Sequence, residues 1–219
     1  AGTALTTGDA NVAVGFNALD LEDTSSHNTA IGYYALSTQN GDTTDTYNVG
    51  VGSQAGLLIS TGNRNVLVGA LSGDAITIAD GNTALGHNTL STNVGSELNT
   101  ALGYQALKTL NIGSGSGYNT AVGASAGYAL TTGIQNTLIG GLAGDALAAG
   151  SYNVALGQEA LGTDTVGSKS VALGGYTLAL QNLTTATDTY NVAVGHLAGY
   201  QVTTGLKNTL IGGLAGDSL

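Results

Sequence analysis

The stretch Asn136-Thr137-Leu138-Ile139-Gly140 decides the fold, because the chain repeats it with small variations twelve times. The motif is Asn, then Thr or Val, then most often Ala, then a branched aliphatic residue, then Gly. The copies begin at Asn11, Asn28, Asn48, Asn65, Asn82, Asn99, Asn119, Asn136, Asn153, Ser170, Asn191 and Asn208. Successive copies start 17 residues apart, except for three spacings of 20 or 21 residues. A near-constant period of this size predicts a solenoid, in which each repeat is one coil stacked on its neighbours.

The composition fits a thin, all-β core. Of the 219 residues, 42% are hydrophobic but only 5% are aromatic, so we expect a core lined by Ala, Val, Ile and Leu. The 36 Gly and the absence of Pro are typical of many similar tight turns. Helical periodicity is weak. The sequence therefore predicts an all-β parallel β-solenoid of twelve coils of about 17 residues.

A longer period groups the coils in fours. The blocks start 71 residues apart, at Asn11, Asn82 and Asn153. The ninth residue of a coil is Leu in the first two coils of each block and Gly in the third and fourth. We interpret residues 1–219 as a single repeat array with blocks at about 6–76, 77–147 and 148–219, forming a segment of a longer fibre.

Strand alternation predicts which motif residues share a face. We expect the second and fourth residues, Thr or Val and a large aliphatic, to face the coil interior. Aspartate at Val122 or Ile139 should then destroy the fold. The third residue, mostly Ala, should face outward and suits packing against another chain. A coil of this length has room for two short strands and two turns.

Each block carries its extra residues at one place. These stretches are residues 37–46, 108–117 and 179–189, rich in Thr, Asn, Asp, Ser and Gly. Insertions in a solenoid form loops on one face, which is often the binding face. The candidate surface-binding residues are Asp42, Thr43, Thr44, Asp45, Asn111, Ser114, Ser116, Asn182, Thr184 and Asp188.

Charge and composition limit the partners. Four Lys and Arg against fourteen Asp and Glu give a net charge of −10, which repels nucleic acid and anionic membranes. No uninterrupted run of eighteen apolar residues is present, so membrane insertion is not expected. Without cysteine, the chain has neither disulfides nor a thiolate metal site.

Two copies of the motif carry a family resemblance. Ser170-Val171-Ala172-Leu173-Gly174 and Asn28-Thr29-Ala30-Ile31-Gly32 resemble repeats in the head domains of trimeric autotransporter adhesins, and similar repeats occur in bacteriophage tail-fibre proteins. The resemblance implies a left-handed parallel β-roll, association of three chains, and binding to host matrix or surfaces. The 17-residue coil and the four-coil block depart from the pattern of that family.

Several sets of residues resemble binding sites, but their spacing favours structural roles. The repeated Asn predicts a ladder of side-chain amides that pair with the backbone of the next coil. The run of residues 140–147 is similar to calcium-binding β-rolls, but Asp74, Asp145 and Asp217 lie four coils apart, roughly 19 Å, too far to share an ion. The three histidines (His27, His87 and His196) have no zinc-site spacing.

The acidic residues give no clear catalytic pair. Asp42 with Asp45, or Glu22 with Asp23, are the only pairs that suggest a glycosidase, and we expect them to be solvated loop acids. The ten tyrosines could form an exposed strip that stacks on sugars or an interchain contact, and the sequence leaves both open.

The expected function is therefore structural and adhesive, without catalysis, cofactor or metal. We expect a segment of an extracellular fibre, such as a phage tail fibre or a bacterial surface adhesin or filament. Its partners would be other copies of the chain, as a homotrimer or an end-to-end filament, and cell-surface glycans or proteins. The alternatives are a polysaccharide-acting tail-spike enzyme and an ice- or calcium-binding solenoid.

Overall fold

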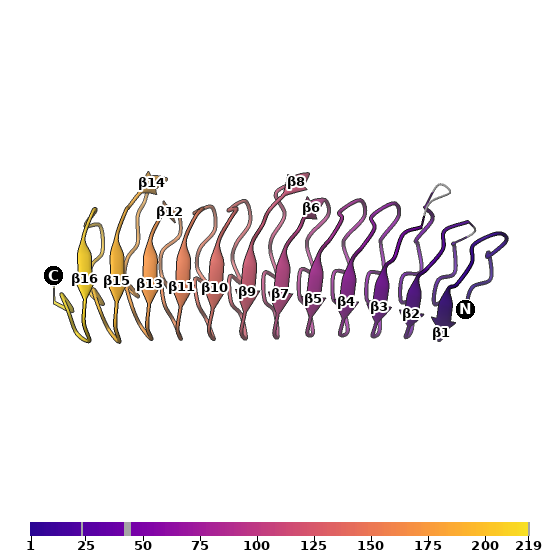
Figure 1. Ribbon diagram of the computed structural model, residues 1–219, viewed down its shortest axis with the longest axis horizontal. Helices are drawn as coiled ribbons and strands as arrows, with labels where there is room; N and C mark the ends of the chain where they lie inside the picture. The colour runs from indigo at the N-terminus through magenta and orange to yellow at the C-terminus, as the bar shows by residue number, and fades with distance from the viewer. Residues whose placement is uncertain (23, 42–44, 219) are drawn as a thin grey trace. The chain divides into compact units, whose positions relative to one another are not determined.

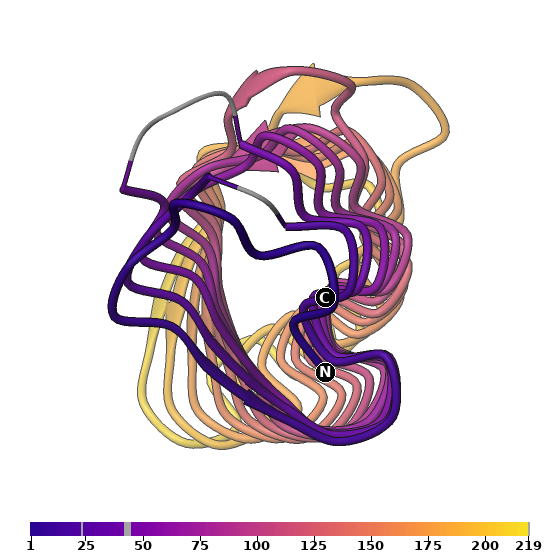
Figure 2. The ribbon, with the colours of Figure 1, turned by 90° about the vertical axis from the view of Figure 1, so that its right-hand side faces the viewer.

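The computed structural model describes residues 1–22, 24–41 and 45–218 and confirms the predicted parallel β-solenoid. Its secondary structure over these residues is strand and turn, without helix. The chain divides into two compact units. Unit 1 comprises residues 1–105 and 111–116, and unit 2 comprises residues 106–110 and 117–219. Within each unit the coils follow one another side by side (Figure 1) and run around a common interior (Figure 2).

Each coil contributes one three-residue strand to a parallel sheet, and the sequence motif forms that strand. In unit 1 the strands are β1 (Val12–Val14), β2 (Thr29–Ile31), β3 (Val49–Val51), β4 (Val66–Val68), β5 (Thr83–Leu85) and β7 (Thr100–Leu102). In unit 2 they are β9 (Thr120–Val122), β10 (Thr137–Ile139), β11 (Val154–Leu156), β13 (Val171–Leu173), β15 (Val192–Val194) and β16 (Thr209–Ile211).

The room for a second strand in each coil is mostly taken by turns instead. Additional pairing in the described residues is confined to the segments next to the insertions. There β6 (Ser96–Glu97) pairs with β8 (Gly115–Ser116) in unit 1, and β12 (Gly167–Ser168) pairs with β14 (Thr187–Asp188) in unit 2. The rest of each coil consists of turns and irregular segments whose backbone groups bond to the adjacent coil.

The register aligns the motif with itself from coil to coil. Leu138 of β10 pairs with Ala121 of β9 and Ala155 of β11, and Ile139 pairs with Val122 and Leu156. Every motif position therefore forms a row along its unit, with neighbouring members one strand spacing apart, ~4.8 Å.

The predicted alternation is present, but its direction was wrong. The third motif residue is the buried one: Ala84 and Leu138 are fully inaccessible to solvent. The fourth residue faces outward, and Val14 and Leu85 are 56% and 49% exposed. Because the first and third residues share a face, the Asn amides also point inward. The Ala row is thus an interior row, and aspartate at Ile139 would not enter the core.

The inward Asn side chains form the predicted amide ladder. The Oδ1 atom of Asn136 accepts the backbone N–H of Asn153 at 3.0 Å, and its Nδ2 donates to the carbonyl of Gly150 at 2.9 Å. The same Nδ2 also donates to Oδ1 of Asn119 at 3.1 Å. The Asn136 amide therefore ties its own coil closed and fixes the next coil in register. Such satisfaction is what makes a buried amide tolerable.

Ser170 interrupts this ladder and shows what the Asn contributes. Its shorter side chain hydrogen-bonds Thr189 and accepts from the Gln181 amide. The backbone N–H of Asn191 in the next coil donates instead to the Thr189 hydroxyl, at 3.5 Å. Thr189 belongs to the insertion of the coil that contains Ser170. A polar side chain from the insertion therefore substitutes for the missing Asn amide.

Core volume explains the four-coil block. A methyl group added to Gly127, the ninth residue of a third coil, would lie 2.8 Å from side-chain carbons of both Leu107 and Leu138. Leu107 is the ninth residue of the coil before it, and Leu138 is the third motif residue of the coil after it. Gly199 has the same relation to Leu178 and Leu210. The large residues of coils two and four thus fill the space that glycine leaves in coil three.

The last motif residue must be glycine for a steric reason. Gly140 has a φ of +136°, and a Cβ built on it would lie 2.4 Å from the carbonyl oxygen of Gly157 in the next coil. Backbone approaches backbone directly at this corner, so an alanine there would separate the coils.

Adjacent residues of one strand test the corrected orientation. We expect Leu138→Ala to destabilise the protein by about 2–5 kcal/mol, because it leaves a cavity between Gly127 and Gly144. Ile139→Ala, one residue later on the outward face, should cost under about 1.5 kcal/mol in the dissociated chain. Chemical denaturation followed by circular dichroism gives both values, and the opposite ranking would contradict the assigned faces.

Candidate functional site

The outward face of the parallel sheet is the most regular surface in both units. Its two rows hold the second motif residue, Thr or Val, and the fourth, Val, Ile or Leu. In unit 1, Val12, Val66 and Leu85 are 47%, 39% and 49% exposed, and in unit 2 Leu156 is 46% exposed. Each unit thus presents a broad stripe in which one row is wholly aliphatic.

The candidate binding residues of the insertions are mostly exposed, as expected of a loop. Asp42, Thr43 and Thr44 lie outside the described residues. The exposed members are Asp45, Asn111, Ser114, Asn182, Thr184 and Asp188, whereas Ser116 is half-buried. Two of them are not in loops, because Ser116 belongs to β8 and Asp188 to β14. Two of the insertions therefore each contain one short strand, which pairs with a strand of the preceding coil (Figure 1).

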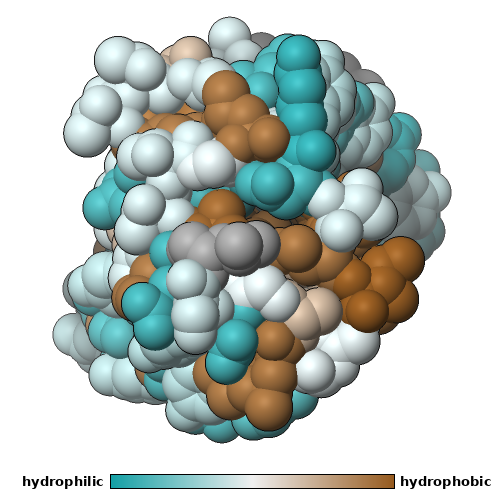
Figure 3. Space-filling model, turned by 90° about the vertical axis from the view of Figure 1, so that its left-hand side faces the viewer, coloured by the Kyte–Doolittle hydropathy of each residue, from teal (hydrophilic) through white to brown (hydrophobic). Residues whose placement is uncertain are grey.

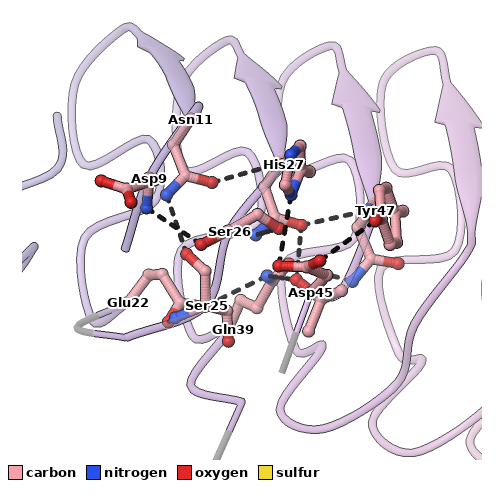
Figure 4. Close-up of polar contacts among 12 residues, drawn as sticks. Asp9, Asn11, Glu22, Ser25, Ser26, His27, Gln39, Asp45 and Tyr47 are labelled. Carbon is pink, nitrogen blue, oxygen red and sulfur yellow. Dashed lines mark hydrogen bonds and ion pairs between the residues drawn. The ribbon is translucent and has the colours of Figure 1, made fainter. Parts of the chain in front are cut away.

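In unit 1, Asp45 is the centre of a small exposed cluster (Figure 4). Its carboxylate lies 3.3 Å from Nδ1 of His27 and accepts a hydrogen bond from the Tyr47 hydroxyl at 3.1 Å. The rings of His27 and Tyr47 stack with centroids 5.0 Å apart. The hydrogen bond to Asp45, together with its negative charge, raises the pKa of the Tyr47 hydroxyl.

Unit 2 repeats the arrangement with lysine in place of histidine. Nζ of Lys169 lies 2.6 Å from the Asp188 carboxylate and 5.3 Å from the centre of the Tyr190 ring. The hydrogen bond with Asp188 raises the pKa of Lys169, and the hydrogen bond from Lys169 lowers the pKa of Asp188. Both clusters join the last residue before an insertion-bearing coil, His27 or Lys169, to the end of the insertion in that coil.

Two acidic side chains are buried. Glu22 was expected to be a solvated loop acid, so that expectation was wrong, and Asp164 is its counterpart in unit 2. Glu22 is inaccessible and accepts the backbone N–H of Thr24 and Ser25, and its other oxygen accepts the amide of Gln39 (Figure 4). Asp164 in unit 2 likewise accepts from Gly167 N–H and the Gln181 amide.

Their shared position could have identified these acids. Glu22 and Asp164 are each the twelfth residue of the first coil of a block, and Asn93 holds that place in the middle block. Asn93 makes the same turn contact, accepting from the backbone N–H of Ser96. Coils three and four have aliphatic residues there, such as Ile59 and Ile76. A recurrent polar residue at an otherwise apolar position indicates a turn-forming role rather than catalysis.

The half-buried carboxylates Asp74 and Asp145 form a further class. Partial burial raises the pKa of both, and for Asp145 the charge of Glu159 adds to the effect. Oδ1 of Asp74 is buried and has no hydrogen-bond partner. These carboxylates therefore carry a desolvation penalty when they are ionised.

The described residues bring no metal-binding set together. No three or more His, Cys, Asp or Glu side chains within the described ranges are grouped so that they could hold an ion. His87 stacks on Tyr104 and His196 contacts Tyr176 edge-on, so these histidines make separate aromatic contacts. In the same part of the chain, no helix has the length and apolar character needed to cross a membrane.

The coil that contains β16 exposes further apolar side chains. Ile211 and Leu214 are 71% and 56% exposed, and Leu206 at the end of the preceding coil is 43% exposed. A view onto this end of unit 2 shows apolar areas distributed among polar ones (Figure 3).

Comparison with known proteins adds no relative: no family model, no curated protein and no solved structure matches the chain significantly.

Two aspartates with opposite pKa shifts give a pH test. Because burial raises the pKa of Asp74, its charge costs stability at pH 7, and the cost disappears as the pH falls below the unfolded-state pKa of about 3.9. Asp74→Asn should therefore raise the melting temperature at pH 7 but not at pH 3.

Asp188→Asn is the matched control. The hydrogen bond from Lys169 lowers the pKa of Asp188, so the ionised carboxylate stabilises the fold above the unfolded-state pKa. This stabilisation is lost as the pH falls and the carboxylate is protonated. The melting temperature of this variant should be slightly lower than that of the parent at pH 7 and equal to it at low pH. Thermal melts of the three proteins between pH 3 and 7 check both signs, and a gain from Asp74→Asn that persists at pH 3 would exclude the charge as its cause.

Proposed function

We propose that the chain is a structural and adhesive segment of an extracellular fibre, of the kind found in phage tail fibres and bacterial surface adhesins or filaments, and that it is not an enzyme. The observation that carries the proposal is the outward sheet face. A soluble protein rarely exposes a large contiguous apolar surface unless it binds something there.

A second copy of the chain is the occupant that fits this face best. Neighbouring strands present the same residue types at one fixed spacing, so an identical surface offers matching ridges and grooves along each unit. Burial of the row containing Val122, Ile139 and Leu156 supplies a favourable free energy of about 25 cal/mol for each Å² removed from water. The resemblance to trimeric adhesin repeats favours three chains.

The insertions are the proposed adhesive elements. They place exposed Asp, Asn, Ser and Thr side chains at intervals of one block, and polar hydroxyl and amide groups suit recognition of cell-surface glycans or proteins. In this arrangement the sheet face holds the fibre together, while the insertions remain available to a receptor.

Association through the sheet face can be tested by a charge. Ile139→Asp should leave the far-ultraviolet circular dichroism spectrum unchanged and convert a parent oligomer to monomer, since the carboxylate would be buried unpaired between chains. Thr132→Asp adds the same charge at an exposed turn of a neighbouring coil and is the matched control.

Sedimentation velocity measures the outcome. The proposal predicts an oligomer, with a trimer mass, for the parent and for Thr132→Asp, and a monomer for Ile139→Asp. A monomeric parent at all concentrations, or an Ile139→Asp protein that assembles like the parent, would contradict it. A polymer that Ile139→Asp does not shorten would favour end-to-end stacking.

The outward orientation also favours a second candidate, ice binding. Thr29, Thr83 and Thr100 lie in the same outward row, where ice could contact them. In the inward orientation expected from the sequence, these side chains could not contact ice. Valine interrupts that row irregularly, and the neighbouring row mixes side chains of different length, which makes the face less flat. Thermal hysteresis and ice-crystal shaping separate the two candidates, because a fibre segment should show neither.

A further inference from the structure

A pocket in unit 2 interrupts the column of side chains at the tenth position of successive coils. That column runs through Tyr128, Asp145, Gly162, Ala179 and Tyr200. Gly162 and Ala179 are its smallest members, and at this place the surface is hollowed into a pocket of about 360 Å³. The pocket extends from Asp145 to Tyr200, three coil spacings or roughly 14 Å.

The pocket has one acidic end and one aromatic end. Asp145 and Glu159 line it together, and Leu142, Leu180 and Tyr200 add apolar and aromatic surface. None of its lining residues is Lys, Arg or His. Partial burial raises the pKa of Asp145, and the nearby negative charge of Glu159 raises it further.

The same unit shows what the chain itself places beside such a tyrosine. One block earlier, Lys108 occupies the position equivalent to Ala179, and its Nζ lies 5.4 Å from the centre of the Tyr128 ring. Tyr128 is the equivalent of Tyr200. In the later block Ala179 has replaced the lysine and is itself 6% exposed. The replacement removes an ammonium group from beside the tyrosine and leaves space in its place.

We propose that this pocket binds an amino-sugar residue with a free ammonium group, presented in a glycan. The ammonium would lie against Asp145 and Glu159, forming charge-assisted hydrogen bonds, and the apolar face of the sugar ring would pack on Tyr200 and the two leucines. The volume is within the range of small-ligand sites. A carboxylate or sulfate sugar would be repelled, and an N-acetylated sugar would lack the charge.

This inference deepens the adhesive part of the proposed function and rests on it for its biological setting, but it is tested separately from assembly. The probe is the β-linked glucosamine disaccharide, titrated into the full chain and followed by isothermal calorimetry and by amide chemical shifts. The N-acetylated disaccharide is the ligand control. We expect binding of the first and at least about tenfold weaker binding of the second, the loss of one charge-assisted contact.

Two variants locate the site. Ala179→Lys should restore the lysine found at Lys108, fill the pocket and abolish binding. Asp145→Asn combined with Glu159→Gln should weaken binding at least about tenfold. Asp9→Asn combined with Asp20→Asn removes the same net charge at residues outside the pocket lining and outside the insertions, and should bind like the parent.

The outcomes are decisive in both directions. Equal binding of the two disaccharides, no binding by the parent, or full binding by Ala179→Lys would overturn the pocket assignment. Sedimentation velocity of the same variants should match the parent, since none of the substituted residues is on the outward sheet face. Variants that lose sugar binding but still assemble would support the site. A parent that binds the sugar but is monomeric would contradict the fibre proposal and leave the pocket assignment standing.

Discussion

The buried amide ladder is the interaction on which the rest of the structure depends. In most coils the Asn side chain accepts a backbone N–H from the next coil and donates to a carbonyl of its own coil, as Asn136 does with Asn153 and Gly150, whereas Asn28 and Asn99 donate to the coil before them. These groups are inaccessible to water, so a coil shifted by one residue would leave them unpaired at a cost of about 1–3 kcal/mol each. The ladder thereby fixes both the register and the inward direction of the first motif residue.

The surface properties follow from that direction. With the Asn inward, strand alternation places the third residue inward as well, where only Ala, Gly or a compensated Leu fits, and turns the large aliphatics outward. The interior is filled across coils instead of within one, as Gly127 between Leu107 and Leu138 shows. Each motif thus presents its Asn and its small third residue to the interior and its large aliphatic residue to the exterior. This orientation is the basis of the lateral association that we propose.

Much of the fold was predictable, and the error has a specific cause. The 17-residue period gave the coils, the parallel stacking and the strand positions, and the repeated Asn predicted the amide ladder. The predicted facing of the strand was wrong because the large aliphatic residues were assigned to the interior, and the predicted amide ladder was not used to decide which side is buried. Sequence could not reveal the pocket either, since it arises where Gly162 and Ala179 come to lie between Asp145 and Tyr200, residues from four different coils.

Native-state hydrogen exchange of one backbone amide tests the ladder most directly. The N–H of Asn153 should be strongly protected in the parent, because it donates to Oδ1 of Asn136 inside the coil. In Asn136→Ala that protection should fall at least about tenfold, whereas Thr137→Ala, which changes the neighbouring outward residue, should leave it unchanged. Equal protection of Asn153 in all three proteins would contradict the account.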